Sequence, residues 1–145
     1  VSVANCDNRP NDECVERLAT SADGINWVIT PLPSGGKWNS VAFGKGILVV
    51  TARHFQDYNS QVIASSDGLQ WLPGKLPFGH LSCPVVFGIG TFVAISDSND
   101  MIATSTDGIQ WTEQPILPII GGISAFGGDR FIILGLNGVV TTAKD

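Results

Sequence analysis

The sequence contains few charged residues. Asp, Glu, Lys and Arg make up 14% of the 145 residues, and 13 acidic residues against 8 basic ones give a net charge of −5. Nucleic acids and anionic membranes are bound by clustered Lys and Arg side chains, and here these residues are scattered singly. We therefore expect no nucleic-acid partner and no membrane insertion.

Long apolar runs and helical periodicity are also missing. No uninterrupted apolar stretch approaches the 18 or more residues that a membrane-spanning helix needs. Short β-prone runs alternate instead with turns supplied by many of the 17 glycines, which adopt the positive φ angles of tight turns. This pattern predicts an all-β protein and argues against coiled coil and disorder.

The sequence contains a repeat. The motif Ser-x-Asp-Gly-x-x-Trp occurs at 21–27, 65–71 and 105–111, with its aspartates 44 and then 40 residues apart, and a fourth copy breaks off at position 145. A period of about 40 residues is typical of stacked or radial arrays of small units. The residues expected to build these structural turns are Ser21, Asp23, Gly24, Trp27, Ser65, Asp67, Gly68, Trp71, Ser105, Asp107, Gly108, Trp111 and Asp145.

A second motif lies upstream of each copy. Phe-Gly-x-Gly or its equivalent begins at Phe43, Phe87 and Phe126, between two β-prone runs, and it predicts a hairpin turn. One unit then has strands at 38–43, 47–51 and 61–65 and a fourth beginning near Trp71. Four short strands in about 40 residues are typical of a β-propeller blade.

The predicted blades are out of phase with the chain. Residues 1–33 would supply strands two to four of one blade, 34–76 and 77–115 two whole blades, and 116–145 strands one to three of a fourth. Residues 1–145 would then form a single partial propeller of about three and a half blades. The first residues resemble the middle of a strand and contain no signal sequence. We therefore expect a processed or partial chain, whose ring is closed by further sequence or by another copy.

These motifs resemble the Asp-box, or BNR, repeat of sialidase-like β-propellers. The usual family form has one more residue between Asp and Gly, and the shorter form is similar to repeats of uncharacterised bacterial and phage surface proteins. Their companion strand motif is present as Trp38-Asn39-Ser40-Val41-Ala42-Phe43-Gly44. The resemblance implies a propeller fold with peripheral Asp-box turns that lie far from any catalytic site.

Sialidase chemistry, as the resemblance describes it, requires three Arg residues that hold a carboxylate, a Tyr nucleophile and an Asp acid/base. The chain has one tyrosine, Tyr58, and four arginines. We expect Arg9 and Arg53 in loops, Arg17 in a third strand and Arg130 at a turn. None of them is expected in an innermost strand. The sequence therefore predicts no catalytic residue and no cofactor. The alternative is a portion of a sialidase-like hydrolase with its catalytic residues outside this chain.

Three cysteines bear on the redox setting. Cys6 and Cys14 flank the longest expected loop, and a disulfide between them would indicate an extracellular or virion-surface protein; two free thiols are the alternative. Cys83, expected in a strand between Ser82 and Pro84, is interpreted as a small buried apolar residue or as an intermolecular bridge.

The loops between the second and third strands differ most among the units, and a function would be expected there. One of them combines aromatic and polar groups that suit contact with a sugar or a protein, namely His54, Phe55, Asp57, Tyr58 and Asn59. Another, at 97–100, is rich in oxygen ligands but lacks EF-hand spacing, so a solvated loop is favoured over calcium and no metal site is predicted.

The sequence as a whole predicts a non-enzymatic extracellular or virion-surface propeller that acts in structural assembly, in glycan or protein binding, or in both. Its expected partners are other copies of itself or the rest of a longer polypeptide. A protein-interaction assembly factor inside the cell is a further alternative.

Overall fold

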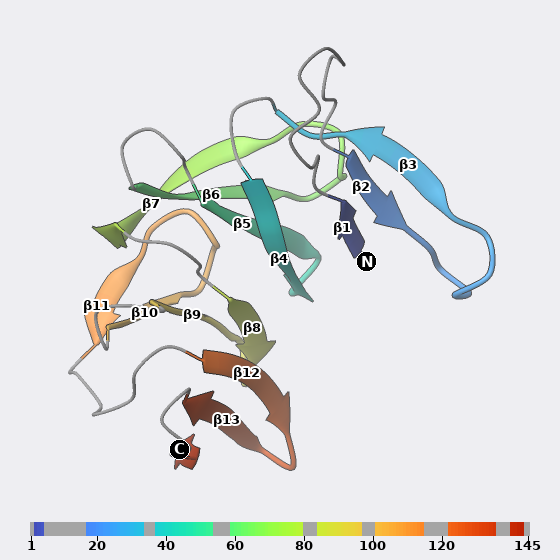
Figure 1. Ribbon diagram of the computed structural model, residues 1–145. Helices are drawn as coiled ribbons and strands as arrows, with labels where there is room; N and C mark the ends of the chain where they lie inside the picture. The colour runs from blue at the N-terminus through green and yellow to red at the C-terminus, as the bar shows by residue number, and fades with distance from the viewer. Residues whose placement is uncertain are drawn as a thin grey trace.

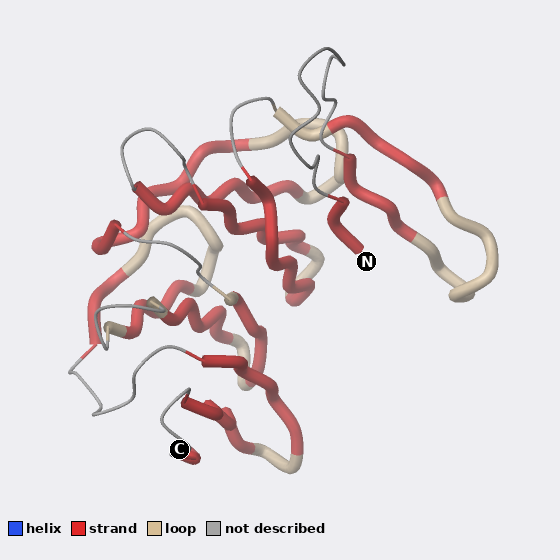
Figure 2. Tube along the Cα trace, in the orientation of Figure 1, coloured by secondary structure: helices blue, strands red, loops and turns tan. Residues whose placement is uncertain are grey.

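A computed structural model describes residues 2–4, 17–33, 37–53, 59–79, 84–96, 101–114, 122–135 and 140–143 (Figures 1 and 2). These residues form fourteen β-strands and contain no helix. The all-β class predicted from the glycine-rich turns is confirmed. Among the described residues there is no helix of the length and apolarity that a membrane span requires.

The strands form four separate antiparallel sheets in chain order. The second and third sheets have four strands, and the first and fourth have three among the described residues. The first sheet is β1 (Ser2–Ala4), β2 (Arg17–Thr20) and β3 (Val28–Pro31), and the second is β4 (Lys37–Gly44), β5 (Ile47–Arg53), β6 (Asn59–Ser65) and β7 (Leu72–Gly79). The third is β8 (Val85–Gly88), β9 (Thr91–Ile95), β10 (Ile102–Ser105) and β11 (Thr112–Gln114), and the fourth is β12 (Gly122–Gly127), β13 (Arg130–Gly135) and β14 (Val140–Ala143).

Strand β7 extends beyond the boundary expected after residue 76. It runs to Gly79, and its side chains alternate so that Leu76 and Phe78 are 4% and 5% exposed while Lys75 and Pro77 face solvent. A strand that buries every second side chain continues as long as the apolar face is covered. The second unit is therefore longer than the sequence repeat suggested.

The hairpins expected at the Phe-Gly motifs are present. Two residues connect β4 to β5, β8 to β9 and β12 to β13, and both have positive φ in each case. These residues are Lys45 and Gly46 (φ 51° and 75°), Ile89 and Gly90 (47° and 74°), and Gly128 and Asp129 (58° and 60°). Positive φ at both central positions is the requirement of a type I′ turn, whose twist matches that of the flanking strands. A glycine at one position of each pair lowers the strain of this turn.

The core lies between the sheets. Leu18 and Leu32 of the first sheet region pack with Trp38 and Val50 of the second, and a larger cluster joins Val49 and its neighbours to the third sheet. A third cluster joins β9 to β13. Each sheet is therefore stabilised by burial of apolar side chains against the next one.

The sheets follow one another around an arc (Figure 1). Strand β4 lies against β8, and β8 lies against β12, while β1 lies against β4. The first strands of consecutive sheets thus contact one another along the inner side of the arc. The hairpin turns that follow β4, β8 and β12 repeat from sheet to sheet, which places their Phe-Gly motifs next to one another.

Candidate functional site

The three described Ser-x-Asp-Gly turns, one in each of the first three sheets, share the same set of hydrogen bonds. In the third turn, Ser105 Oγ accepts the amide N–H of Gly108 at 2.8 Å, and Asp107 Oδ1 accepts those of Ile109 and Gln110, both at 2.8 Å. The serine hydroxyl also donates to Asp107 Oδ1 at 2.9 Å. The first and second turns repeat these bonds within 0.1 Å. Short polar side chains that bond their own backbone in this way are a local feature of the sequence.

The hydrogen bonds lower the pKa of the aspartates. The amides of Asn26 and Ile25 hold the pKa of Asp23 well below its usual value, those of Gln70 and Leu69 do so for Asp67, and those of Ile109 and Gln110 for Asp107. Donors that bond the charged form stabilise it. Each carboxylate is therefore ionised near neutral pH and is directed at its own backbone, which suits a structural turn and not a general acid.

The third turn is packed against the second sheet. A Cβ atom on Gly108 would meet Val49 Cγ2, and would lie 3.3 Å from Ala64 Cβ. The carbonyl of Ile109 accepts a hydrogen bond from the amide of Lys75 in β7, at 3.4 Å. This turn therefore belongs to the contact between two sheets as well as to its own sheet.

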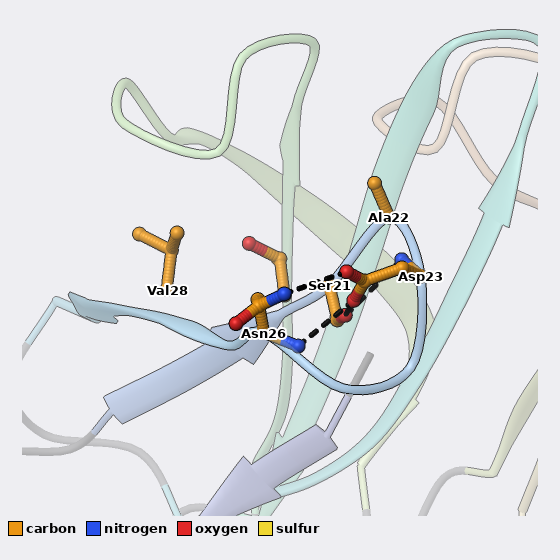
Figure 3. Close-up of a pocket in the computed structure, with 6 residues that line it drawn as sticks. Ser21, Ala22, Asp23, Asn26 and Val28 are labelled. Carbon is orange, nitrogen blue, oxygen red and sulfur yellow. Dashed lines mark hydrogen bonds between the residues drawn. The ribbon is translucent and has the colours of Figure 1, made fainter.

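The first turn is exposed. No described atom lies within 4 Å of a Cβ built on Gly24, and Ile25 and Trp27 are 80% and 48% exposed. The turn borders an open hollow of about 450 Å³ (Figure 3), lined by Thr20, Ser21, Ala22, Asp23, Asn26 and Val28. The Asp23 carboxylate is already hydrogen-bonded within the turn, since its Oδ2 also accepts a hydrogen bond from Asn26 Nδ2 at 2.8 Å. Among the described residues that line the hollow, Asp23 is the only acid, and its carboxylate is bonded within the turn.

The motif tryptophans pack on their sheets in two of three cases. Trp111 donates from Nε1 to the carbonyl of Gly108 at 3.0 Å and contacts the largest apolar cluster, and Trp71 contacts the cluster between the first two sheets. Nε1 of Trp71 is buried and has no partner among the described residues. Trp27, the tryptophan of the first turn, is by contrast 48% exposed.

The first glycine of two of the three Phe-Gly motifs has a role that the motif alone did not reveal. The ring of Phe87, in the third sheet, occupies the position that a Cβ on Gly44 would take, and Phe126 of the fourth sheet does the same at Gly88. These glycines are therefore required for close approach of the next sheet rather than for φ. The recurrence of Phe directly before Gly in every unit was the signal that could have identified this contact.

Most of the predicted loop and cysteine sites lie outside the described residues. These are Cys6, Cys14, Cys83, His54, Phe55, Asp57, Tyr58 and Asp145, together with Arg9 and residues 97–100. Asn59 was expected in a loop, but it begins β6 and pairs with Gly79, because the ladder with β7 extends that far. Pro84 was expected within a strand and instead precedes β8, where its carbonyl accepts the amide of Ile95 at 3.1 Å.

Arg17 lies in a strand as expected, whereas Arg130, expected at a turn, is the first residue of a strand. Arg17 begins β2 and Arg130 begins β13, both with exposed side chains. Arg53 was expected in a loop, but it ends β5 and pairs with Ser60. No arginine lies in β4, β8 or β12. In the described part of the chain, no three His, Cys, Asp or Glu side chains are grouped so that they could hold a metal ion.

No protein-family model matches this sequence, and no curated protein matches it. The repeated turns and the contacts between sheets are therefore the features from which a function can be inferred.

Proposed function

We propose that this chain is a non-enzymatic β-propeller segment of Asp-box type, which acts in structural assembly and binds a surface glycan or protein through its variable loops. The ring would be larger than the four sheets of this chain. The setting would be extracellular or the surface of a virion.

The observation that carries the proposal is the repeated contact between sheets. Phe87 lies on Gly44 and Phe126 lies on Gly88, and apolar clusters join each pair of neighbouring sheets. Polar side chains of the three turns bond to their own backbone. A chain whose repeated elements serve packing and turn formation in this way suits a scaffold, and it leaves recognition to the loops that differ between units.

The first test measures assembly and ligand binding together. Light scattering of the native protein, beside its intact mass under denaturing conditions, should give a defined multimer or a longer polypeptide. A glycan panel should show binding that Phe55→Ala with Tyr58→Ala weakens by about tenfold, or about 1.4 kcal/mol. Trp27→Ala is the matched control, since it removes an aromatic group 48% exposed on another loop. A monomer that binds no glycan would contradict the proposal.

The main alternative is a portion of a sialidase-like hydrolase. It predicts turnover of a fluorogenic sialoside that Tyr58→Phe abolishes, because the phenol would be the nucleophile. Turnover of this kind would replace the proposal. The described arginines do not favour it, since none lies in β4, β8 or β12.

The proposed setting depends on Cys6 and Cys14. Purification with thiols trapped should show these two residues joined in a disulfide, as expected for an oxidising compartment. Two alkylated thiols would favour the intracellular assembly factor instead.

A further inference from the structure

Each Ser-x-Asp-Gly turn contains an Asp-Gly bond, which is among the peptide bonds most prone to rearrange in water. The sequence has three such bonds, at positions 23–24, 67–68 and 107–108, and all of them lie in these turns. The nitrogen of a glycine can approach the side chain before it closely, because glycine has no Cβ atom. The repeated turn therefore also repeats a chemically reactive bond.

The rearrangement removes one molecule of water and then adds one. The glycine nitrogen forms a bond to the carboxyl carbon, Cγ, of the aspartate, and the amide hydrogen leaves with the carboxyl hydroxyl group as water. The product is a five-membered cyclic imide. Water then adds to one of its two carbonyl groups, and addition at the main-chain carbonyl gives isoaspartate, whose chain continues through Cγ. The first step therefore needs a glycine N–H that is free to react and a carboxyl group in its neutral form.

Both reacting groups are hydrogen-bonded in the first turn, where Ser21, Asp23 and Asn26 point toward one another (Figure 3). The amide of Gly24 donates to Ser21 Oγ at 2.8 Å. Asp23 Oδ1 accepts the amides of Ile25 and Asn26, both at 2.8 Å, and these bonds keep the pKa of Asp23 below its usual value. An imide has neither the glycine N–H nor the carboxylate charge, so its formation loses the first bond and weakens the others.

The serine contacts both reacting groups. Ser21 Oγ accepts the amide of Gly24, and the same hydroxyl donates to Asp23 Oδ1 at 2.9 Å. Ser65 and Ser105 make the equivalent pairs of bonds in the second and third turns. We propose that the serine of each turn protects the Asp-Gly bond beside it from imide formation, and so from conversion to isoaspartate. The motif then preserves the covalent chain as well as the shape of the turn.

The first turn depends most on its serine. In the third turn, a Cβ on Gly108 would meet Val49, and the turn also accepts the amide of Lys75 from the second sheet, so this turn is packed. In the first turn, no described atom lies within 4 Å of a Cβ on Gly24. Exposed segments with few packing contacts open most readily. Loss of the serine should therefore be detected most clearly at Asp23.

The test measures isoaspartate in the full chain and in two variants. Ser21→Ala removes the hydroxyl, and Ser21→Thr is the matched control because it keeps one. Each protein is incubated at neutral pH and physiological temperature, and mass spectrometry with electron-transfer fragmentation locates isoaspartate in the chain. Ser21→Ala should form isoaspartate at position 23 about tenfold faster than the unmodified chain, since it loses the bond to the Gly24 amide and the bond to the carboxylate. Ser21→Thr should match the unmodified chain.

Positions 67 and 107 show within the same molecule whether the effect is local. They should form isoaspartate at the same rate in Ser21→Ala as in the unmodified chain, because Ser65 and Ser105 are still present. A rise at all three positions would show general unfolding instead of the loss of one serine, and would overturn the proposal. An unchanged rate at position 23 would overturn it as well.

A synthetic peptide of residues 21–27 measures the reaction without the folded turn. It should form isoaspartate about a hundredfold faster than position 23 of the unmodified chain, because both reacting groups are then free of their bonds. Equal rates in the peptide and the chain would overturn the proposal. The protection concerns the turns alone, so it does not rest on the proposed role in assembly or glycan binding, and either can fail without the other.

Discussion

The first and third Ser-x-Asp-Gly turns have the same local structure and different surroundings. In both, the aspartate accepts two backbone amides at 2.8 Å and the glycine has a φ of 75°. Gly108 is nevertheless buried against the second sheet, while Gly24 has open space around it. The turn therefore forms without a neighbouring sheet, and its contribution to the contact between sheets depends on whether a neighbour is present.

The largest losses of unfolding free energy are expected for alanine at the two glycines. Gly24→Ala and Gly108→Ala both force a left-handed residue to carry a Cβ, which costs about 1–2 kcal/mol of unfolding free energy in each turn. At Gly108 the Cβ also collides with Val49, and overpacking adds about 1–3 kcal/mol. Urea unfolding of both variants measures the difference. Equal losses would mean that the third turn is not packed in solution.

Smaller losses of unfolding free energy are expected for the tryptophans. Trp111→Ala removes a half-buried ring that bonds Gly108 and contacts the core, and should cost about 2–3 kcal/mol, below the range for a fully buried aromatic residue. Trp27→Ala removes an exposed ring and should change the free energy of unfolding by less than about 0.5 kcal/mol. The same urea titrations apply. A loss at Trp27 as large as that at Trp111 would show that a partner covers the first turn.

The serines should differ by less again. Ser105→Ala leaves the buried amide of Gly108 without an acceptor and should cost about 1–2 kcal/mol. Ser21→Ala exposes the equivalent amide of Gly24 to water, so its cost should stay below about 0.5 kcal/mol. Thermal unfolding at one pH compares them. Similar shifts in Tm would indicate that burial does not affect this hydrogen bond.

The smallest difference between the turns is expected in their pH dependence. The folded pKa of Asp23 and of Asp107 lies below the ordinary value of 3.8, so each stabilises the fold fully above that pH and loses this contribution as pH falls through the folded pKa. Asp23→Asn and Asp107→Asn should each reduce the loss of stability in acid, and Asp23→Asn by somewhat more, because Asp23 also accepts a hydrogen bond from Asn26 Nδ2. Unfolding curves recorded between neutral pH and pH 2 measure this dependence of the unfolding free energy on pH.

If only one of these two variants lost less stability in acid, that result would contradict the local origin of the pKa shift. Leu69→Ala, which changes an exposed side chain beside Asp67 but removes none of its hydrogen-bond donors, is the control and should leave the pH dependence unchanged.

The local structure of this protein could be predicted from short motifs in its sequence. The repeat predicted the strands at 38–43, 47–51 and 61–65 within a few residues, and the glycines predicted the hairpins, because turn geometry depends on the φ angles of one or two residues. The serines and aspartates predicted the turns for the same reason, since their bonds join residues at most three positions apart.

Contacts between sheets were decided only by the tertiary structure. Nothing in the motifs distinguishes Gly24 from Gly108 or Trp27 from Trp111, because the difference comes from residues such as Val49 that are far away in the chain. The role of Gly44 under Phe87, and the exposure of Phe43, likewise follow from which sheet lies beside which. A short motif records the bonds within a turn, whereas burial depends on surface that distant segments provide.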